Sequence, residues 1–507
     1  MSSKVFSAAV IGLDCEPVEV EADNSPYGNP GIFIVGLPDK AVDESKSRVR
    51  SAIKNSDLGF PRGNVTINLA PADLRKAGTY YDLPIALSCL AQAGQLEIRD
   101  NWRDNLFVGE LALNGELRPV SGVLSIALMV QEKEIKNLFV PQANAAEASL
   151  VDGFNIYPVE NLRQVADHFS GVMPIEPFIR GEINFFDNEF FEFDLSFIKG
   201  QEQAKRALEI AAAGSHNILM SGPPGSGKTM LAKALPSILP KMTLAESLEV
   251  TRIYSAAGLL PAGQPLIASR PYRSPHHTAS GVALVGGGAW PRPGEISLSH
   301  RGVLFLDEFL EFPKSVLENL RQPLEDGIVS VSRATGTLKF PAKFILVAAM
   351  NPCPCGFLSD SEKQCACQPS QILKYQKRAS GPLLDRIDLH LEVPRVKFER
   401  LESDLSGETS AEIRVRVQNA RDLQTQRFKA ENIFDNSEMN PQQIVKYCLL
   451  EEAGRQLLRQ AVEQLHLSAR AYHRVLKLAR TIADLSQSEK ILLEHLAEAL
   501  QYRPKVE

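Results

Sequence analysis

The chain has 507 residues, 44% of them hydrophobic and 23% charged, a composition typical of a globular protein of about three domains. It contains no apolar run near the roughly 18 residues that a membrane-spanning helix needs, so we expect no membrane partner. The first 21 residues carry four acidic side chains where an export signal would be apolar, which favours a cytoplasmic location. The net charge of −6 does not indicate nucleic-acid binding, although basic loops facing a channel are compatible with it.

Residues 1–170 are predicted to form an α/β module. The runs GIFIVGLP and NVTINLAP resemble strands, and DLPIALSCLAQAG and VLSIALMVQEKEI have helical patterns. The pair Asn114-Gly115 lies between two apolar alternations and predicts a β-hairpin. Residues 171–194 are rich in acids and aromatics and are predicted to be a linker whose phenylalanines dock on a domain: Phe185, Phe186, Phe190 and Phe191.

A second α/β domain is predicted over residues 195–395, and it opens with a phosphate-binding loop. The buried strand ILM at 218–220 runs into GPPGSGKT, and MLAKALPSIL continues as a helix. Glycines in such a loop let backbone N–H groups turn inward around phosphates. We expect Lys228 to reach the β- and γ-phosphates of ATP and Thr229 to ligate Mg²⁺. The predicted nucleotide-binding residues are Gly222, Pro223, Pro224, Gly225, Ser226, Gly227, Lys228, Thr229 and Met230.

Two later strands are predicted to complete this site. GVLFL places Asp307 and Glu308 at the carboxyl end of a strand, where α/β sheets bind their ligands. Asp307 fits a Mg²⁺ carboxylate and Glu308 fits the group that polarises the attacking water. The strand FILVAAM ends at Asn351, which is predicted to orient the same water, although an asparagine before proline also starts turns.

Four of the seven cysteines follow Asn351 within 15 residues: Cys353, Cys355, Cys365 and Cys367. Four thiolates match the ligand count of a closed structural Zn²⁺ site. Disulfides are disfavoured in the cytoplasm, and free thiols are the remaining alternative. The sequence therefore favours zinc, in a role that fixes geometry beside the site of hydrolysis.

Arginines beyond the cysteines are candidates for contacting ATP. Arg386 lies in SGPLLDRIDLHLEV, where it either pairs with Asp385 or Asp388 or acts as an arginine finger on the neighbouring subunit's γ-phosphate. Residues 400–507 are predicted to form a helical lid domain. In it, Arg470 or Arg474 is expected to contact the nucleotide, and Arg470 is preferred.

These motifs together resemble an AAA+ ATPase, and more narrowly the magnesium-chelatase-like family of the ComM and YifB type. The resemblance covers essentially the whole chain through AAVIGLDCEPVEVE, IVGLPDKAVDESKSRVRSA, VTINLAPADLRK, RPYRSPHHTAS, NPCPCG and SGPLLDRIDLHLEVP. It implies a homohexameric ring with ATP bound between subunits. It also implies a DNA-dependent ATPase, a helicase that drives branch migration in recombination during natural transformation, working with recombination proteins.

Two excursions are expected to line the channel of such a ring. One is the segment PYRSPHHTASGVALVGGGAWPRPGEISLSHRG, and the other is the hairpin-like GIVSVSRATGTLKFPAKF. Basic tips there would bind the phosphates of single-stranded or branched DNA without reading its sequence. The candidate DNA contacts are Arg273, His276, His277, Arg333 and Lys339. Two ordinary surface hairpins are the alternative, and adjacent histidines are a poor metal site.

The N-terminal module resembles the proteolytic domain of Lon-type proteases, which has the ribosomal S5 domain 2-like fold. That family uses a Ser–Lys dyad, whereas this sequence places Tyr80 and Leu124 at the two positions, with Thr79 the nearest hydroxyl. A phenol and an alkyl chain do not form a nucleophile and an amine base, so we expect a non-catalytic domain. The alternative overall function is a metal-insertion (chelatase-type) or protein-remodelling ATPase.

Overall fold

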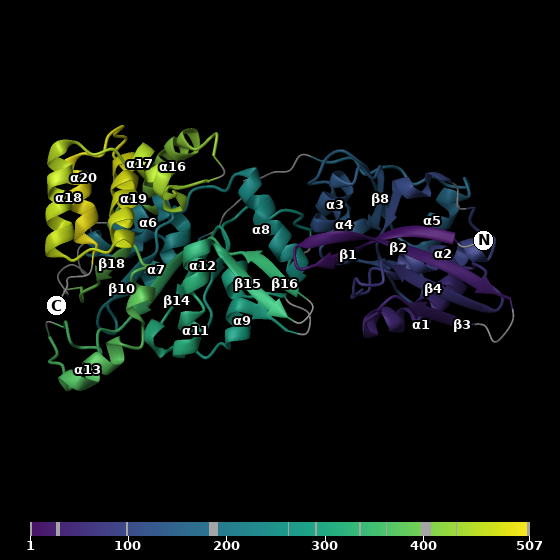
Figure 1. The fold of residues 1–507 in the computed structure, drawn as a ribbon, viewed down its shortest axis with the longest axis horizontal. Helices are drawn as coiled ribbons and strands as arrows, with labels where there is room; N and C mark the ends of the chain where they lie inside the picture. Colours follow the sequence, from purple (N-terminus) through teal and green to yellow (C-terminus); the bar gives the residue numbers. More distant parts are fainter. Residues whose placement is uncertain are drawn as a thin grey trace. The chain divides into compact units, whose positions relative to one another are not determined.

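The computed structural model describes residues 3–26, 31–97, 100–181, 191–261, 263–288, 292–333, 336–360, 362–396, 407–431 and 433–503 (Figure 1). The chain divides into two compact units, each made of two separate stretches of sequence. Unit 1 contains Met1–Phe185 and Leu244–Ile267, and unit 2 contains Phe186–Thr243 and Ala268–Glu507.

Unit 1 is built on a mixed seven-stranded sheet of order β3-β4-β2-β1-β5-β8-β9. The alternation of buried and exposed residues along β2 and β4 gives the sheet one apolar face for the core. The antiparallel pairs are β1–β2 and β2–β4, and the other four are parallel. The strands are β1 (Ser3–Ile11), β2 (Asp14–Ser25), β3 (Gly31–Val35), β4 (Asn64–Ala70), β5 (Asn105–Phe107), β8 (Asn137–Pro141) and β9 (Asn155–Val159).

The helices of unit 1 bury strongly apolar faces against this sheet. In α2, residues 82–90 are all buried, as expected for a helix whose sequence is apolar on nearly every side. The predicted hairpin at Asn114-Gly115 is confirmed: β6 (Glu110–Leu111) pairs with β7 (Leu117–Arg118), and Gly115 has φ +89°. The helices before residue 186 are α1 (Lys40–Asn55), α2 (Asp82–Gln92), α3 (Val123–Glu132), α4 (Gln142–Ala148) and α5 (Leu162–Phe169), with a 3-10 turn η1 (Asp100–Asp104).

A further helix of unit 1, α8 (Leu244–Ala257), comes from the middle of the chain, after the phosphate-loop motif. Leu248 packs against the cluster that α3 and α4 form, and Leu266 is buried within it. The hydroxyl of Ser255 accepts a hydrogen bond from the N–H of Gly122 (3.0 Å) and donates to the carboxylate of Glu147. The guanidinium of Arg252 donates to the carbonyl of Leu13 at 2.6 Å. Apolar and polar contacts therefore fix α8 in unit 1.

Unit 2 is built on a five-stranded sheet of order β11-β14-β17-β10-β18, in which every pair is parallel. Its central strands are continuous apolar runs, as expected where helices cover both faces. The carboxyl ends of β14, β17 and β10 share one edge, which is where the candidate site lies. The strands are β11 (Tyr272–Arg273), β14 (Val303–Leu306), β17 (Ile345–Met350), β10 (Ile218–Ser221) and β18 (Leu389–Glu392).

Short helices and two hairpins connect these strands. The hairpin predicted in GIVSVSRATGTLKFPAKF is confirmed as β15 (Ile328–Arg333) paired with β16 (Gly336–Pro341), and a smaller hairpin joins β12 (Gly286–Gly287) to β13 (Arg292–Pro293). The helices up to residue 396 are α6 (Glu202–Gly214), α7 (Lys228–Ala234), α9 (Gly281–Val285), α10 (Glu295–Leu298), α11 (Lys314–Glu318), α12 (Arg321–Asp326), α13 (Pro369–Gln376) and α14 (Gly381–Leu384). The 3-10 turns are η2 (Leu195–Phe197), η3 (Leu235–Ile238) and η4 (Phe309–Glu311).

The described C-terminal part of unit 2 is helical, in agreement with the helical region that the sequence predicts. In the described residues from 407 onward the elements are α16 (Ser410–Arg427), η5 (Asn436–Glu438), α17 (Pro441–Tyr447), α18 (Glu452–Gln464), α19 (Ala469–Leu485) and α20 (Leu493–Gln501). Thr409 caps α16 in a capping box with Glu412, and Ser468 caps α19. Helices α16 and α19 pack on α6, so this helical region shares its core with the sheet domain.

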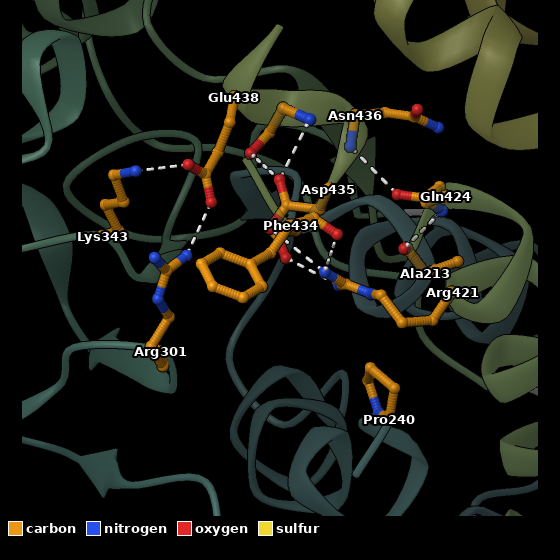
Figure 2. Close-up of polar contacts among 12 residues, drawn as sticks. Ala213, Pro240, Arg301, Lys343, Arg421, Gln424, Phe434, Asp435, Asn436 and Glu438 are labelled. Atoms are coloured by element: carbon orange, nitrogen blue, oxygen red, sulfur yellow. Dashed lines mark hydrogen bonds and ion pairs between the residues drawn. The ribbon is translucent and has the colours of Figure 1, made fainter. Parts of the chain in front are cut away.

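A buried polar network ties the helical region to the strand ends opposite the candidate site (Figure 2). Glu438 of η5 binds both Arg301 (2.6 Å) and Lys343, which lie just before β14 and β17, and Arg301 stacks on the ring of Phe434. Beside them, the guanidinium of Arg421 binds the Asp435 carboxylate at 3.1 Å. Removing one partner of a buried pair of this kind typically costs about 3–5 kcal/mol, because the other charge is left buried without a counter-charge.

The fold class predicted from the sequence is confirmed: two α/β sheets, the second wholly parallel, are followed by a helical region. Of the linker phenylalanines, Phe191 contacts the guanidinium of Arg414 at 4.5 Å, while Phe185, Phe186 and Phe190 lie outside the described residues. Among the described helices, none is both long and apolar enough to cross a bilayer.

Candidate ATP and metal site

The phosphate-loop motif forms a tight turn between β10 and α7. Gly225 and Gly227 have φ of +78° and +91°, a left-handed conformation that disfavours other residues. At Gly222, a Cβ would lie 2.1 Å from the carbonyl oxygen of Val393, so only glycine fits there. Pro223 and Pro224 continue the turn, Ser226 is buried, and Met230 is exposed on α7. The loop therefore has the backbone that the motif predicts.

Lys228 is the buried cation of the loop. Its ammonium group donates to the carbonyls of Gly222 (2.7 Å) and Pro223 (2.9 Å) and lies 3.5 Å from the side-chain oxygen of Asn351. Burial lowers the pKa of Lys228, and the nearby Asp307 carboxylate opposes this shift. A lysine held by loop carbonyls and not by a carboxylate is available for exchange onto a phosphate oxygen.

Thr229 and Asp307 form a pair of oxygen ligands. The hydroxyl of Thr229 donates to the carboxylate of Asp307 at 2.8 Å, although 78 residues separate them along the chain. A hydroxyl and a carboxylate from a phosphate loop and a neighbouring strand end suit Mg²⁺, which prefers oxygen ligands and keeps several waters. The residues therefore fit the ion that the sequence predicts.

Glu308 directly follows Asp307 in an unusual backbone conformation. Its φ of +50° is left-handed, and its N–H donates to the Asp307 carboxylate at 2.9 Å. The side chain is exposed, and one carboxylate oxygen lies 3.1 Å from Nδ1 of His277. Such strain at a non-glycine residue is most often found at functional sites. The structure therefore brings His277 to the candidate catalytic carboxylate.

The four cysteines after Asn351 form one cluster. Their sulfur atoms all lie within 4.8 Å of one another, and none forms a disulfide. The N–H of Phe357 helps to lower the pKa of Cys355 to about 6, whereas contacts with the sulfur atoms of Cys353 and Cys355 contribute to a raised pKa of Cys365. Four sulfur ligands with no further position to fill match a structural Zn²⁺ site, so the chemistry of the donors fits zinc.

The cysteine segment also touches the phosphate loop. Gly356 has φ +83°, and a Cβ there would lie 2.6 Å from Cδ of Pro224. The segment is braced on its other side by Arg395, whose guanidinium binds Asp360 at 2.8 Å. The cluster therefore supports the loop that would hold ATP.

Arg386 and Arg470, two of the candidate nucleotide contacts, meet at one carboxylate. Each binds one oxygen of Glu325, which lies near the end of α12. The other lid candidate, Arg474, binds the buried Asp388 at 2.8 Å. Asp388 also accepts a hydrogen bond from the N–H of Asn217, so Arg474 belongs to a buried structural pair.

The candidate DNA contacts lie in different surroundings. Arg273 of β11 forms a two-point ion pair with Glu295 (2.6 and 2.7 Å), and His276 contacts Thr278. On the β15–β16 hairpin Lys339 is exposed, whereas the side chain of Arg333 lies outside the described residues. Arg273 and His277 therefore have partners within the chain, and Lys339 faces solvent.

The two residues that the sequence aligns with a Ser–Lys dyad, Tyr80 and Leu124, both lie in unit 1. The Tyr80 hydroxyl oxygen accepts a hydrogen bond from the N–H of Val10 (3.2 Å), and burial raises its pKa to about 12. Leu124 is buried in the core of unit 1. The nearest hydroxyl, Thr79, binds Glu110. These contacts are with neighbouring groups of unit 1.

Sequence reasoning missed Glu325 altogether. It is one of two adjacent acids at the end of a six-residue helix, and nothing in its neighbourhood in the sequence distinguishes it from a solvated surface residue. From the sequence, His277 is a candidate DNA contact and a poor candidate for a metal ligand, and its contact with Glu308 is not predicted. Its approach to Glu308 depends on the parallel pairing of β11 with β14, which places the segment after β11 beside the residues that follow β14.

A phosphate loop, a strand-end Asp-Glu pair and an asparagine on the strand between them, on a parallel sheet followed by a helical region, define the AAA+ class. Comparison with protein families agrees along the chain: residues 194–401 match "Magnesium chelatase, subunit ChlI", residues 18–144 "Subunit ChlI of Mg-chelatase" and residues 407–503 "Magnesium chelatase, subunit ChlI C-terminal". The chain belongs to the magnesium-chelatase family of AAA+ proteins.

Similar proteins extend over the full length. The chain is 45% identical to Competence protein ComM of Haemophilus influenzae, over 99% of this chain and 97% of that protein. It is 43% identical to the uncharacterized protein YifB of Escherichia coli, with the same coverage of both chains. Similarity to the magnesium-chelatase 38 kDa subunit of Cereibacter sphaeroides is 27% and covers 32% of this chain and 53% of that subunit.

Proposed function

We propose that the protein is an ATP-driven DNA motor, a hexameric helicase that promotes branch migration of DNA junctions during recombination and natural transformation. The observation that carries the proposal is the full-length similarity to a competence protein in a chain whose phosphate loop, Asp307 and Glu308 are brought together. Working in the cytoplasm with recombination proteins is part of the same proposal.

ATP hydrolysis would use the residues of the site as follows. Lys228 and the loop N–H groups bind the phosphates, and Thr229 and Asp307 hold Mg²⁺, which neutralises charge on the phosphates. Glu308, released from His277, accepts a proton from the attacking water, and Asn351 orients that water. Arg386 of an adjacent subunit stabilises the charge that develops on the γ-phosphate.

DNA would be bound through its backbone by the β15–β16 hairpin, whose basic residues are Arg333 at the end of β15 and Lys339, which is paired with Ser330 in the middle of the hairpin. Exposed lysine and arginine side chains bind phosphates without sequence preference. Because Arg273 is paired with Glu295 and His277 with Glu308, we assign these two residues to the support of the loop and the carboxylate, and leave His276 as the DNA candidate of that segment.

We further propose that the cysteine cluster holds one structural Zn²⁺ ion. The support is the meeting of four sulfur atoms within 4.8 Å in a chain segment braced on both sides. The metal would fix this segment against Pro224 and take no part in hydrolysis.

A second candidate is a metal-insertion or protein-remodelling ATPase, which the partial similarity to a magnesium-chelatase subunit favours. The decisive experiment measures ATP hydrolysis with and without single-stranded DNA and four-way junctions, together with the ATP-dependent movement of a labelled junction. We expect DNA to stimulate hydrolysis and ATP to drive branch migration. Hydrolysis that DNA does not change, with junctions left unmoved, would favour the second candidate.

A further inference from the structure

Glu325 binds two arginines that arrive from different parts of unit 2. Arg386 follows α14, and Arg470 lies in the first turn of α19 in the helical region. One oxygen of the Glu325 carboxylate accepts from Arg386 and the other from Arg470. Both sides of the carboxylate are therefore occupied by guanidinium groups.

The three side chains differ in burial in a way that suggests exchange. Arg386 is only 4% exposed, and its second contact is with the carbonyl of Pro382 at 2.5 Å. The side chain of Glu325 is 40% exposed and that of Arg470 is 57% exposed. The carboxylate thus covers Arg386 on the solvent side, and the hydrogen bond from Arg386 lowers the pKa of Glu325.

A carboxylate and a phosphate compete for the same guanidinium. Both present oxygen atoms in the geometry that the planar, forked group of arginine matches, and both are negatively charged. While Arg386 and Arg470 bind Glu325, they do not bind a nucleotide phosphate with the same N–H groups. The negative charge of Glu325 also offsets the repulsion between the guanidinium groups of Arg386 and Arg470, so the two can lie close together.

The location of Glu325 connects this pair of arginines to the hairpin. Helix α12 ends at Asp326, Gly327 turns the chain with φ +65°, and β15 begins at Ile328. The buried Val329 fixes the start of β15 against its surroundings, so the hairpin and the end of α12 are joined by a very short connection. A displacement of the hairpin would therefore move Glu325.

We propose that Glu325 is a positioning residue that holds Arg386 and Arg470 in a waiting state, and that DNA bound at the β15–β16 hairpin withdraws it so that the arginines transfer to an ATP phosphate. This inference rests on the proposed function, because it assumes that Arg386 and Arg470 act on ATP. It adds Glu325 as the residue that couples DNA binding at the hairpin to the positions of Arg386 and Arg470.

The test compares the wild-type chain with Glu325→Gln, which keeps the size of the side chain and removes its charge. Basal hydrolysis is expected to rise by about threefold or more, while the rate with saturating single-stranded DNA stays within about twofold of wild type. The degree of DNA stimulation should therefore fall. Partial unfolding of the variant would lower the basal and the DNA-stimulated rates together, so it would not produce a raised basal rate with an unchanged stimulated rate.

Glu318→Gln is the matched control. Glu318 is the last residue of α11, seven residues before Glu325, and contacts Arg321 at 3.0 Å and Ser380 but neither Arg386 nor Arg470, so its substitution should leave the stimulation ratio of the wild type. Glu325→Asp is a second variant, because it keeps a negative charge beside the buried Arg386 and so protects the fold. Its side chain is too short to bind both arginines, so it should also raise basal hydrolysis. Melting temperatures of all variants show whether each is folded.

The proposal is overturned if folded Glu325→Gln and Glu325→Asp proteins have unchanged basal rates, or lose basal and stimulated hydrolysis in the same proportion. A failure of the proposed function looks different. Wild-type hydrolysis that DNA does not stimulate would count against the DNA motor and against the hairpin step, while the basal rates of the variants would still decide whether Glu325 restrains the arginines.

Discussion

Individual side chains divide the work at the phosphate loop. Lys228 supplies a positive charge inside the phosphate loop. Glu308 follows β14, has a left-handed backbone conformation and exposes its carboxylate. In the proposed mechanism, Lys228 would contact the ATP phosphates throughout the cycle, whereas Glu308 would act only when water attacks. Substitutions at the two positions should therefore separate binding from hydrolysis.

Lys228→Ala is expected to lower ATP binding and hydrolysis together, because the loop loses its buried cation. Glu308→Gln is expected to bind ATP as wild type and to hydrolyse it at least about 10²-fold more slowly. Fluorescent-nucleotide binding and phosphate release measure the two quantities. The control is Glu311→Gln. This substitution lies three residues after Glu308 and removes a partner of Arg378, and the variant should hydrolyse ATP normally. Normal turnover in either of the first two variants would refute the site.

His390 gives a pH-dependent prediction in β18. Burial and the charge of Arg503 lower its pKa from 6.5 to about 4. The unfolded chain therefore takes up the proton first, and the stability that neutral His390 contributes is lost as pH falls from 6.5 toward 4. At pH 5 the loss is about 2 kcal/mol.

His390→Gln should remove this part of the pH dependence. Urea unfolding at pH 7 and pH 5 measures the free energy of unfolding of both proteins, and the wild type should lose about 2 kcal/mol more than the variant between the two values. Equal losses in the two proteins would contradict the assignment.

Individual site residues could be predicted from the sequence where a local motif determines the backbone conformation. GPPGSGKT specifies glycines that must turn and a lysine that must follow, and the structure has both. The role of Glu325 was not predictable, because it depends on where α14 and α19 end in space. The partner of His277 was hidden for the same reason, since strand pairing creates it.

Among the elements, the cysteine segment makes the sharpest prediction. The protein purified under reducing conditions should contain about one zinc per chain by metal analysis. Cys353→Ser should lose the metal and weaken ATP binding by about fivefold, since Gly356 would no longer be held against Pro224. Cys448→Ser, in a buried cysteine of the helical region outside the cluster, should keep its zinc. Zinc well below one per chain in the wild type would rule out the site.

Elements with strong local signals were predicted well. The hairpin at Asn114-Gly115 follows from turn chemistry, and β10 and β14 from apolar runs before polar strand ends. The packing of α8 in unit 1 was not anticipated, because its sequence has no clear apolar stripe that would assign it to one unit. The anchoring of η5 by Arg301 and Lys343 was also beyond the sequence, since it joins charges more than 90 residues apart.

For the whole molecule, the sharing of a site between subunits is the main proposal. Arg386→Ala should bind ATP and fail to hydrolyse it. Lys228→Ala lacks ATP but still presents Arg386 to a neighbour. If the finger acts in trans, an equimolar mixture should regain about a quarter of wild-type hydrolysis, because one adjacent pairing in four unites an intact loop with an intact finger. A mixture as inactive as its components would show that Arg386 acts within its own chain.

The position of α8 has a consequence for how the protein is made and how it can be divided. Unit 1 receives its last helix only after the phosphate loop has been synthesised, so its core is incomplete on the ribosome while more than fifty further residues are added. A fragment that ends at residue 185 would leave Glu147 and the N–H of Gly122 without the Ser255 hydroxyl. A shortened chain meant to contain unit 1 alone would therefore have to include residues 244–267 as well.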